Sequence, residues 1–139
     1  MLDRKTRLRL LAGALASAVL ASPALSSPVY DEEKFGDYLE LRDCTAMLAA
    51  AAIVYGREIG QNAPRFHYFA DTAQSGEARL IGMIESGLVA PTGDLVTRSQ
   101  LEAGWEQRIQ SHISALQEGA DLGEDAWDHA AGCASDLKL

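Results

Sequence analysis

Two cysteines constrain the fold of this chain more than any other residues. Cys44 and Cys133 are the only cysteines among the 139 residues. They lie far apart in the chain, one near its first third and the other close to its end. An even cysteine count in an oxidising compartment predicts one disulfide, which would fold the last segment back onto an early one. The alternative is a pair of free, buried thiols. A redox enzyme is disfavoured because no C-x-x-C motif is present.

The amino-terminal segment predicts that the chain is exported to an oxidising compartment of this kind. Four basic residues lie within positions 4–9, and an uncharged apolar stretch, 10–20, follows before the small residues of ASPALSS. This order is typical of a cleaved secretory signal peptide. The apolar stretch is much shorter than the roughly 20 residues that span a bilayer, which disfavours the alternative of a retained membrane anchor. Cleavage could follow Ala21, Ala24 or Ser26. We expect Ser26, which gives a signal peptide over 1–26, a flexible mature amino terminus over 27–34 and one domain over 35–139.

Charge limits the partners of the mature chain. The whole sequence has 12 basic and 20 acidic residues, and the segment 1–26 holds four of the basic and one of the acidic ones. The mature part therefore has 8 basic and 19 acidic residues, a net charge of −11. Such a surface repels phosphate backbones and anionic lipid heads, so nucleic-acid binding is disfavoured and a basic protein partner is favoured. The alternative is that acidity only keeps the protein in solution.

Helical periodicity dominates the mature part. Apolar residues recur at three- and four-residue steps, the spacing of one helix face, in four segments. The first runs from about Phe35 to Ile59, and the second opens at Pro64, with Ser75-Gly76 as a weak point in its middle that allows a kink or break. The third begins at two capping-box matches, T-x-x-Q at 97–100 and S-x-x-E at 99–102, and the fourth covers about 125–137.

No segment alternates with a period of two, so no strand is predicted. Short connections make consecutive helices antiparallel neighbours. The sequence therefore predicts an all-α, up-down-up-down four-helix bundle in which a disulfide links the first and last helices. The alanine run from Ala49 to Ala52 would pack inside this bundle or form a homodimer seam, and Trp105 and Trp127 would anchor the packing of the third helix against the fourth.

Motifs that carry chemistry are absent from the sequence. There is no C-x-x-C-H for haem, no H-E-x-x-H for zinc, no G-x-S-x-G, no phosphate-binding glycine loop and no EF-hand loop. His67 and His112 are interpreted as polar residues at the edge of an apolar face. His129 follows Asp125 by four residues, which supplies two of the four ligands that a structural zinc needs. No cofactor and no metal are therefore predicted.

Two clusters are candidate binding sites. One is aromatic and would line a pocket for a small apolar ligand, with Tyr55, Phe66, Tyr68 and Phe69. The other is acidic and would dock a basic partner, with Glu118, Asp121, Glu124, Asp125 and Asp128. The alternative for the second is a solvated loop and helix start.

These observations favour a non-enzymatic periplasmic or secreted protein that acts through a helical surface on another envelope or secreted protein. The role would be that of an inhibitor, an immunity or chaperone-like factor, or an accessory subunit. Two alternatives remain open at this point. One is a carrier of small apolar ligands, and the other is a metal-dependent enzyme that uses His112 or His129.

Overall fold

Four α-helices make up the folded part of the chain. The computed structural model describes residues 29–118 and 124–139, and the side chains of Glu118 and of residues 124–126 are not described. The helices are α2 (Glu32–Glu58), α3 (Pro64–Glu85), α4 (Arg98–Glu118) and α5 (Glu124–Asp136). Within the described ranges the only extended pairing is an isolated bridge between Val89 and Leu95 in the α3–α4 connection. The predicted all-α fold is confirmed, whereas the signal peptide falls in residues outside the described part.

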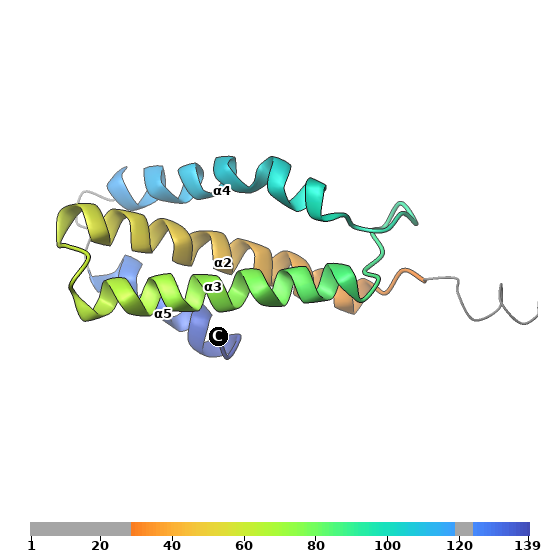
Figure 1. Ribbon diagram of the computed structural model, residues 1–139, viewed down its shortest axis with the longest axis horizontal. Coiled ribbons are helices and arrows are strands. Elements are labelled where there is room, and N and C mark those ends of the chain that lie inside the picture. Colours follow the sequence, from red (N-terminus) through yellow and green to blue (C-terminus); the bar gives the residue numbers. More distant parts are fainter. Residues whose placement is uncertain (1–28, 119–123) are drawn as a thin grey trace, which may run out of the picture.

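The bundle is built around α2. Figure 1 shows α2 between α3 and α4, and α5 lies on another side of α2. Each helix runs in the direction opposite to the one before it. Helix α2 packs against all three other helices, which have only sparse contacts with one another. Its burial extends around its circumference, because small and apolar residues occupy nearly every position from Cys44 to Val54. The up-down-up-down bundle is confirmed, and one central helix holds it together.

The helix ends follow local hydrogen-bonding rules. The Asp31 side chain accepts a hydrogen bond from the Lys34 N–H at 3.2 Å, and Glu32 and Glu33 favour the positive end of the helix dipole. Helix α2 therefore begins three residues before the expected Phe35. At the start of α4, Thr97 and Gln100 exchange the two hydrogen bonds of a capping box, at 3.1 and 3.2 Å.

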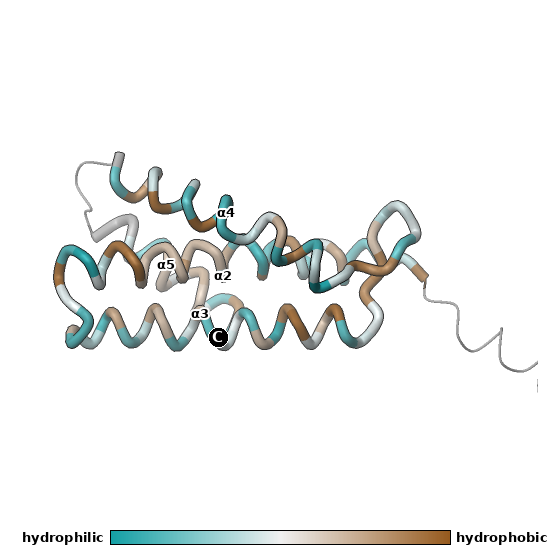
Figure 2. Tube along the Cα trace, turned by 45° about the horizontal axis from the view of Figure 1, so that its top comes forward, coloured by the Kyte–Doolittle hydropathy of each residue, from teal (hydrophilic) through white to brown (hydrophobic). Residues whose placement is uncertain are grey.

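Two adjoining hydrophobic clusters form the core. The larger one joins all four helices around Leu48, Phe69 and Trp127, and it includes the alanines at 50–52, which are buried inside the bundle. The smaller one lies at the other end, around Tyr38 and Leu80, and takes in the α3–α4 connection. In Figure 2 this connection carries apolar, brown stretches, in agreement with the burial of Leu88, Val89 and Val96.

One expectation about side-chain packing is wrong. Trp127 belongs to the larger cluster and Trp105 to the smaller one, so they do not anchor α4 against α5. The reason is that α2 occupies the space between those helices. Helix α3 continues without a break through Ser75-Gly76, where Gly76 packs closely against Thr45 of α2.

Candidate functional site: an acidic groove beside the disulfide

The predicted disulfide is present. Cys44, in the middle of α2, is bonded to Cys133, near the end of α5, and their Cα atoms lie 5.9 Å apart. A sequence separation of 89 residues makes this bond a long-range closure of the fold. It fastens the short helix α5, which has its main contacts with α2.

A groove runs along the surface between α2 and α5 at this bond. Its lining contains both half-cystines and Met47, and carboxylates stand on either side of them. Glu40 and Asp43 come from α2, whereas Asp128 and Asp136 come from α5. All four acidic residues are exposed to solvent. We call this surface, with His129, the acidic groove.

Helix periodicity explains why these residues meet. Glu40 precedes Cys44 by four residues, and His129 precedes Cys133 by four, so each pair shares one helix face. Because α2 and α5 run in opposite directions, the disulfide places Glu40 toward Asp136 at one end of the groove and His129 at the other end, past the bond. The disulfide therefore determines the position of the groove.

The charge of the groove is largely uncompensated. The described residues form two ion pairs by side-chain distance, Arg98 with Glu102 and His112 with Asp43. In that part of the chain Glu40, Asp128 and Asp136 therefore have no cationic group within ion-pair distance. Unpaired carboxylates in a partly enclosed space attract cations more strongly than scattered ones, because the low-dielectric walls focus the field.

Two cationic residues lie in a hollow that adjoins one end of the groove. A second hollow shares Glu40, Asp136 and Leu137 with the groove, and Arg79 and Lys138 help to line it. The Arg79 guanidinium donates hydrogen bonds to the carbonyl oxygens of Leu137 and Lys138. This arginine therefore holds the chain after α5 against α3.

The three histidines occupy different environments. His112 Nε2 lies 3.1 Å from Asp43 Oδ1, which links α4 to the rim of the groove on α2. His129 lines the groove itself, and His67 is exposed with its ring against Phe66. Across the described ranges, no group of three or more His, Cys, Asp or Glu side chains is placed to hold a metal ion.

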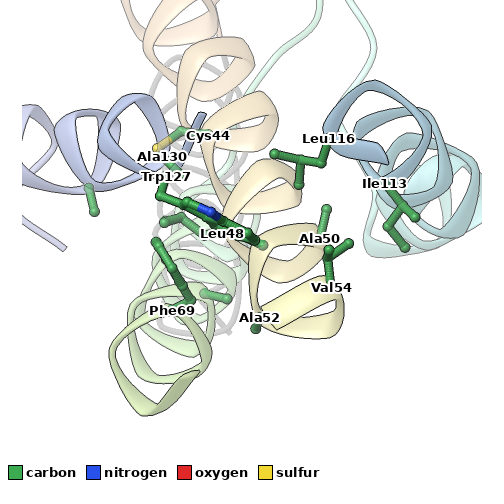
Figure 3. Close-up of a cluster of buried hydrophobic side chains, with 13 residues drawn as sticks. Cys44, Leu48, Ala50, Ala52, Val54, Phe69, Ile113, Leu116, Trp127 and Ala130 are labelled. Atoms are coloured by element: carbon green, nitrogen blue, oxygen red, sulfur yellow. The ribbon is translucent and has the colours of Figure 1, made fainter. Parts of the chain in front are cut away.

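The four residues of the predicted aromatic pocket do not line one common pocket. Tyr55 and Phe69 stack edge-on with each other, and both rings contact Trp127, at centroid distances of 5.3 and 5.7 Å. Figure 3 shows Trp127 extending from α5 toward Leu48 and Phe69. Tyr68 is exposed, and Phe66 lines a separate apolar groove between α2 and α3 with Ile53.

Most of the predicted acidic patch lies outside the described residues. Asp121 is among residues 119–123, and the side chains of Glu118, Glu124 and Asp125 are not described. Asp128 is the one member whose side chain is placed, and it lines the acidic groove. Sequence reasoning missed Glu40, Asp43 and Asp136 as neighbours of Asp128. Their helical spacing from the two cysteines is the signal that would have found them.

Comparisons with known proteins give the chain no relatives. No protein-family model, no curated protein and no solved structure matches it. Within the described residues, no helix is both long enough and apolar enough to cross a membrane. The residues of the groove and the disulfide are therefore the features that indicate a function.

Proposed function

We propose that this chain is an exported, non-enzymatic helical protein that binds a basic protein partner through the acidic groove between α2 and α5. The partner would be another envelope or secreted protein. The role would be inhibitory, protective, chaperone-like or that of an accessory subunit.

The observation that carries the proposal is the set of carboxylates beside the disulfide. Glu40, Asp128 and Asp136 line the same groove without a cationic partner among the described residues. Carboxylates placed together repel one another, and a bound lysine or arginine side chain relieves that repulsion. The two helices that carry them are covalently joined, so the groove keeps its shape without a partner and loses little entropy on binding.

Export to the periplasm or the medium is part of the proposal. The basic and apolar amino-terminal segment supports it, and so does the disulfide, because such bonds persist in oxidising compartments. Mass determination of the protein isolated from its native host tests this part. A mature chain that begins close to Ser27 and has lost two hydrogens as a disulfide is expected. An intact amino terminus with two free thiols would contradict export.

The carrier alternative has one supporting observation. The groove between α2 and α3 is lined mostly by apolar groups, among them Ile53, Phe66 and Ala70, and Ile59 is exposed nearby in the chain. Tyr55 and Phe69, in contrast, fill the core with Trp127. Native mass spectrometry of freshly purified protein separates the two functions, because a carrier retains a small molecule and a protein-binding module does not require one.

Crosslinking in living cells tests the leading function. A photoreactive amino acid is placed at Met47 in the groove, and the same amino acid at Glu85, which is exposed at the end of α3, is the control. A basic protein captured only from Met47 is expected. Its complex with purified protein should weaken steeply as ionic strength rises and should weaken again in Glu40→Gln. Equal capture from both positions, or binding unaffected by Glu40→Gln, would contradict the proposal.

A further inference from the structure

The disulfide lies in the wall of the acidic groove. Cys44 is almost fully buried, with an exposed fraction of 4%, whereas Cys133 is partly exposed, and both line the groove. Gly132, which is exposed beside Cys133, adds no side chain that could cover the bond. A small molecule in the groove can therefore approach the Cys133 sulfur without unfolding of the bundle.

Negative charge surrounds this approach. Glu40 is one helical turn from Cys44, Asp43 is its neighbour in the chain, and Asp136 is three residues from Cys133. Asp128 lines the same groove. Any reagent that reaches the bond has to enter this field, and thiolate reagents bring charges of their own.

We propose that the Cys44–Cys133 disulfide is a thiol-exchange site that reacts with positively charged thiols in preference to neutral or anionic ones, through the acidic groove and in the folded state. The inference goes beyond binding of a protein partner and does not depend on it. It assigns a chemical class of substrate, the aminothiols, to a bond that otherwise has only a structural role.

The exchange is an ordinary two-step reduction. A thiolate, the reactive form of a thiol, attacks the sulfur of Cys133, which is the more exposed of the two residues. A mixed disulfide forms at Cys133, the S–S bond breaks, and Cys44 leaves as a thiolate that takes a proton from water. A second thiolate attacks the sulfur of the bound reagent, which releases Cys133 as a thiolate and then a thiol. Two molecules of reagent thiol are thereby oxidised to their disulfide, and two electrons reduce the protein disulfide to two thiols.

The attacking sulfur is negative in every thiolate reagent. The reagents therefore differ in the charge on the rest of the molecule, and this charge decides how the groove attracts or repels them. An aminothiol such as cysteamine carries a compensating ammonium that the carboxylates of the groove attract. A sulfonate thiol such as 2-mercaptoethanesulfonate adds a second negative charge, which the same carboxylates repel. In water, the summed attraction and repulsion of several carboxylates give roughly a tenfold or larger rate difference between these two reagents at low ionic strength. The difference should shrink as salt screens the field.

The experiment measures second-order rate constants for reduction of the folded, mature protein. Cysteamine, 2-mercaptoethanol and 2-mercaptoethanesulfonate are compared, and each rate is divided by the rate of the same reagent with a small uncharged disulfide. This division removes differences in thiol pKa and nucleophilicity. We expect a normalised ratio of cysteamine to sulfonate of about ten at an ionic strength near 0.02 M, and a ratio near one at about 0.5 M.

Matched variants locate the effect. The double variant Glu40→Gln with Asp136→Asn removes two exposed groove charges and should lower the ratio about threefold. The double variant Glu85→Gln with Glu58→Gln removes the same charge from exposed positions outside the groove lining and should leave the ratio unchanged. An equal effect of the two double variants would overturn the proposal, because net charge would then be the cause. A reduction rate independent of thiol concentration would also overturn it, because opening of the fold would then limit the reaction.

Discussion

Gly76 of α3 lies against Thr45 of α2 with no space for a β-carbon between them. A β-carbon at Gly76 would overlap the Thr45 side chain, coming within 2.8 Å of its Cγ2. Thr45 is completely buried, and its hydroxyl donates a hydrogen bond to the Leu41 carbonyl oxygen of its own helix at 2.6 Å. The threonine therefore needs no polar partner on α3, and the two backbones approach closely at this point.

Replacement of Gly76 by alanine tests this close approach. Helix propensity alone predicts that Gly76→Ala stabilises the protein by up to about 1 kcal/mol. We expect the opposite, a loss of about 1–3 kcal/mol, because the methyl group forces α2 and α3 apart. Denaturant unfolding of the oxidised protein measures the change.

Gly82 supplies the matched control for Gly76. It lies in the same helix, it is exposed, and a β-carbon there meets nothing within 4 Å. Gly82→Ala should therefore stabilise the protein by about 0.5–1 kcal/mol. If both variants change stability in the same direction, the contact with Thr45 does not govern the packing of α3.

The disulfide should contribute much of the stability of this small domain. Closing a loop of about 90 residues is worth at most about 4–5 kcal/mol on the chain-entropy model. The double variant Cys44→Ala with Cys133→Ala should therefore unfold at a much lower denaturant concentration. The wild-type protein under reducing conditions should lose a similar amount. A midpoint unchanged by reduction would show that helix packing alone holds α5 in place.

The sequence was sufficient for the helices and for the closure of the fold, because both depend on local spacing and on two cysteines. The capping box at Thr97 and Gln100 and the pairing of Cys44 with Cys133 are confirmed. What could not be predicted was which helices share a core. That depends on α2, whose alanines leave it buried on several sides, so that α4 and α5 are kept apart.

The candidate site was predicted less well for a related reason. Charge density along the chain pointed to residues 118–128, whereas the acidic groove combines two distant segments that meet only through the disulfide. Of the predicted patch, Asp128 alone is placed in the groove. Glu40 and Asp43 are ordinary exposed helix residues in the sequence, and their role becomes visible only when α5 lies beside them.

Arg79 should act as an anchor for the end of the chain. Its guanidinium donates to the carbonyl oxygens of Leu137 and Lys138, the latter at 2.9 Å, which joins α3 to the turn after α5. Hydrogen bonds from a charged group are worth about 1.5–3 kcal/mol each when shielded, and exposure of Arg79 lowers this to about 1 kcal/mol in total. Arg79→Ala should therefore accelerate amide hydrogen exchange in α5 more than in α4.

Arg98 provides the comparison for Arg79. Its ion pair with Glu102, at 3.2 Å, lies within one helix and is exposed on both sides. Arg98→Ala should change the free energy of unfolding by no more than about 0.5 kcal/mol and leave exchange in α5 unaltered. Equal exchange rates in α5 for the two variants would remove the anchoring role of Arg79.

Trp127 should be the side chain on which α5 most depends for packing. It is 5% exposed, and its ring meets those of Tyr55 and Phe69, so it connects α5 to both α2 and α3. Trp127→Ala should cost about 3–5 kcal/mol, because the cavity it leaves lies among α2, α3 and α5, and the disulfide ties α5 to α2 and limits its collapse into that cavity. Trp105→Ala should cost less, since Trp105 is only partly buried and packs at the edge of the smaller cluster. Denaturant unfolding of both variants in the oxidised state measures the difference, and near-ultraviolet circular dichroism should lose most of its aromatic signal only in Trp127→Ala. If Trp105→Ala proves the more destabilising variant, the larger cluster is not the main core and α5 is held by its covalent bond rather than by its tryptophan.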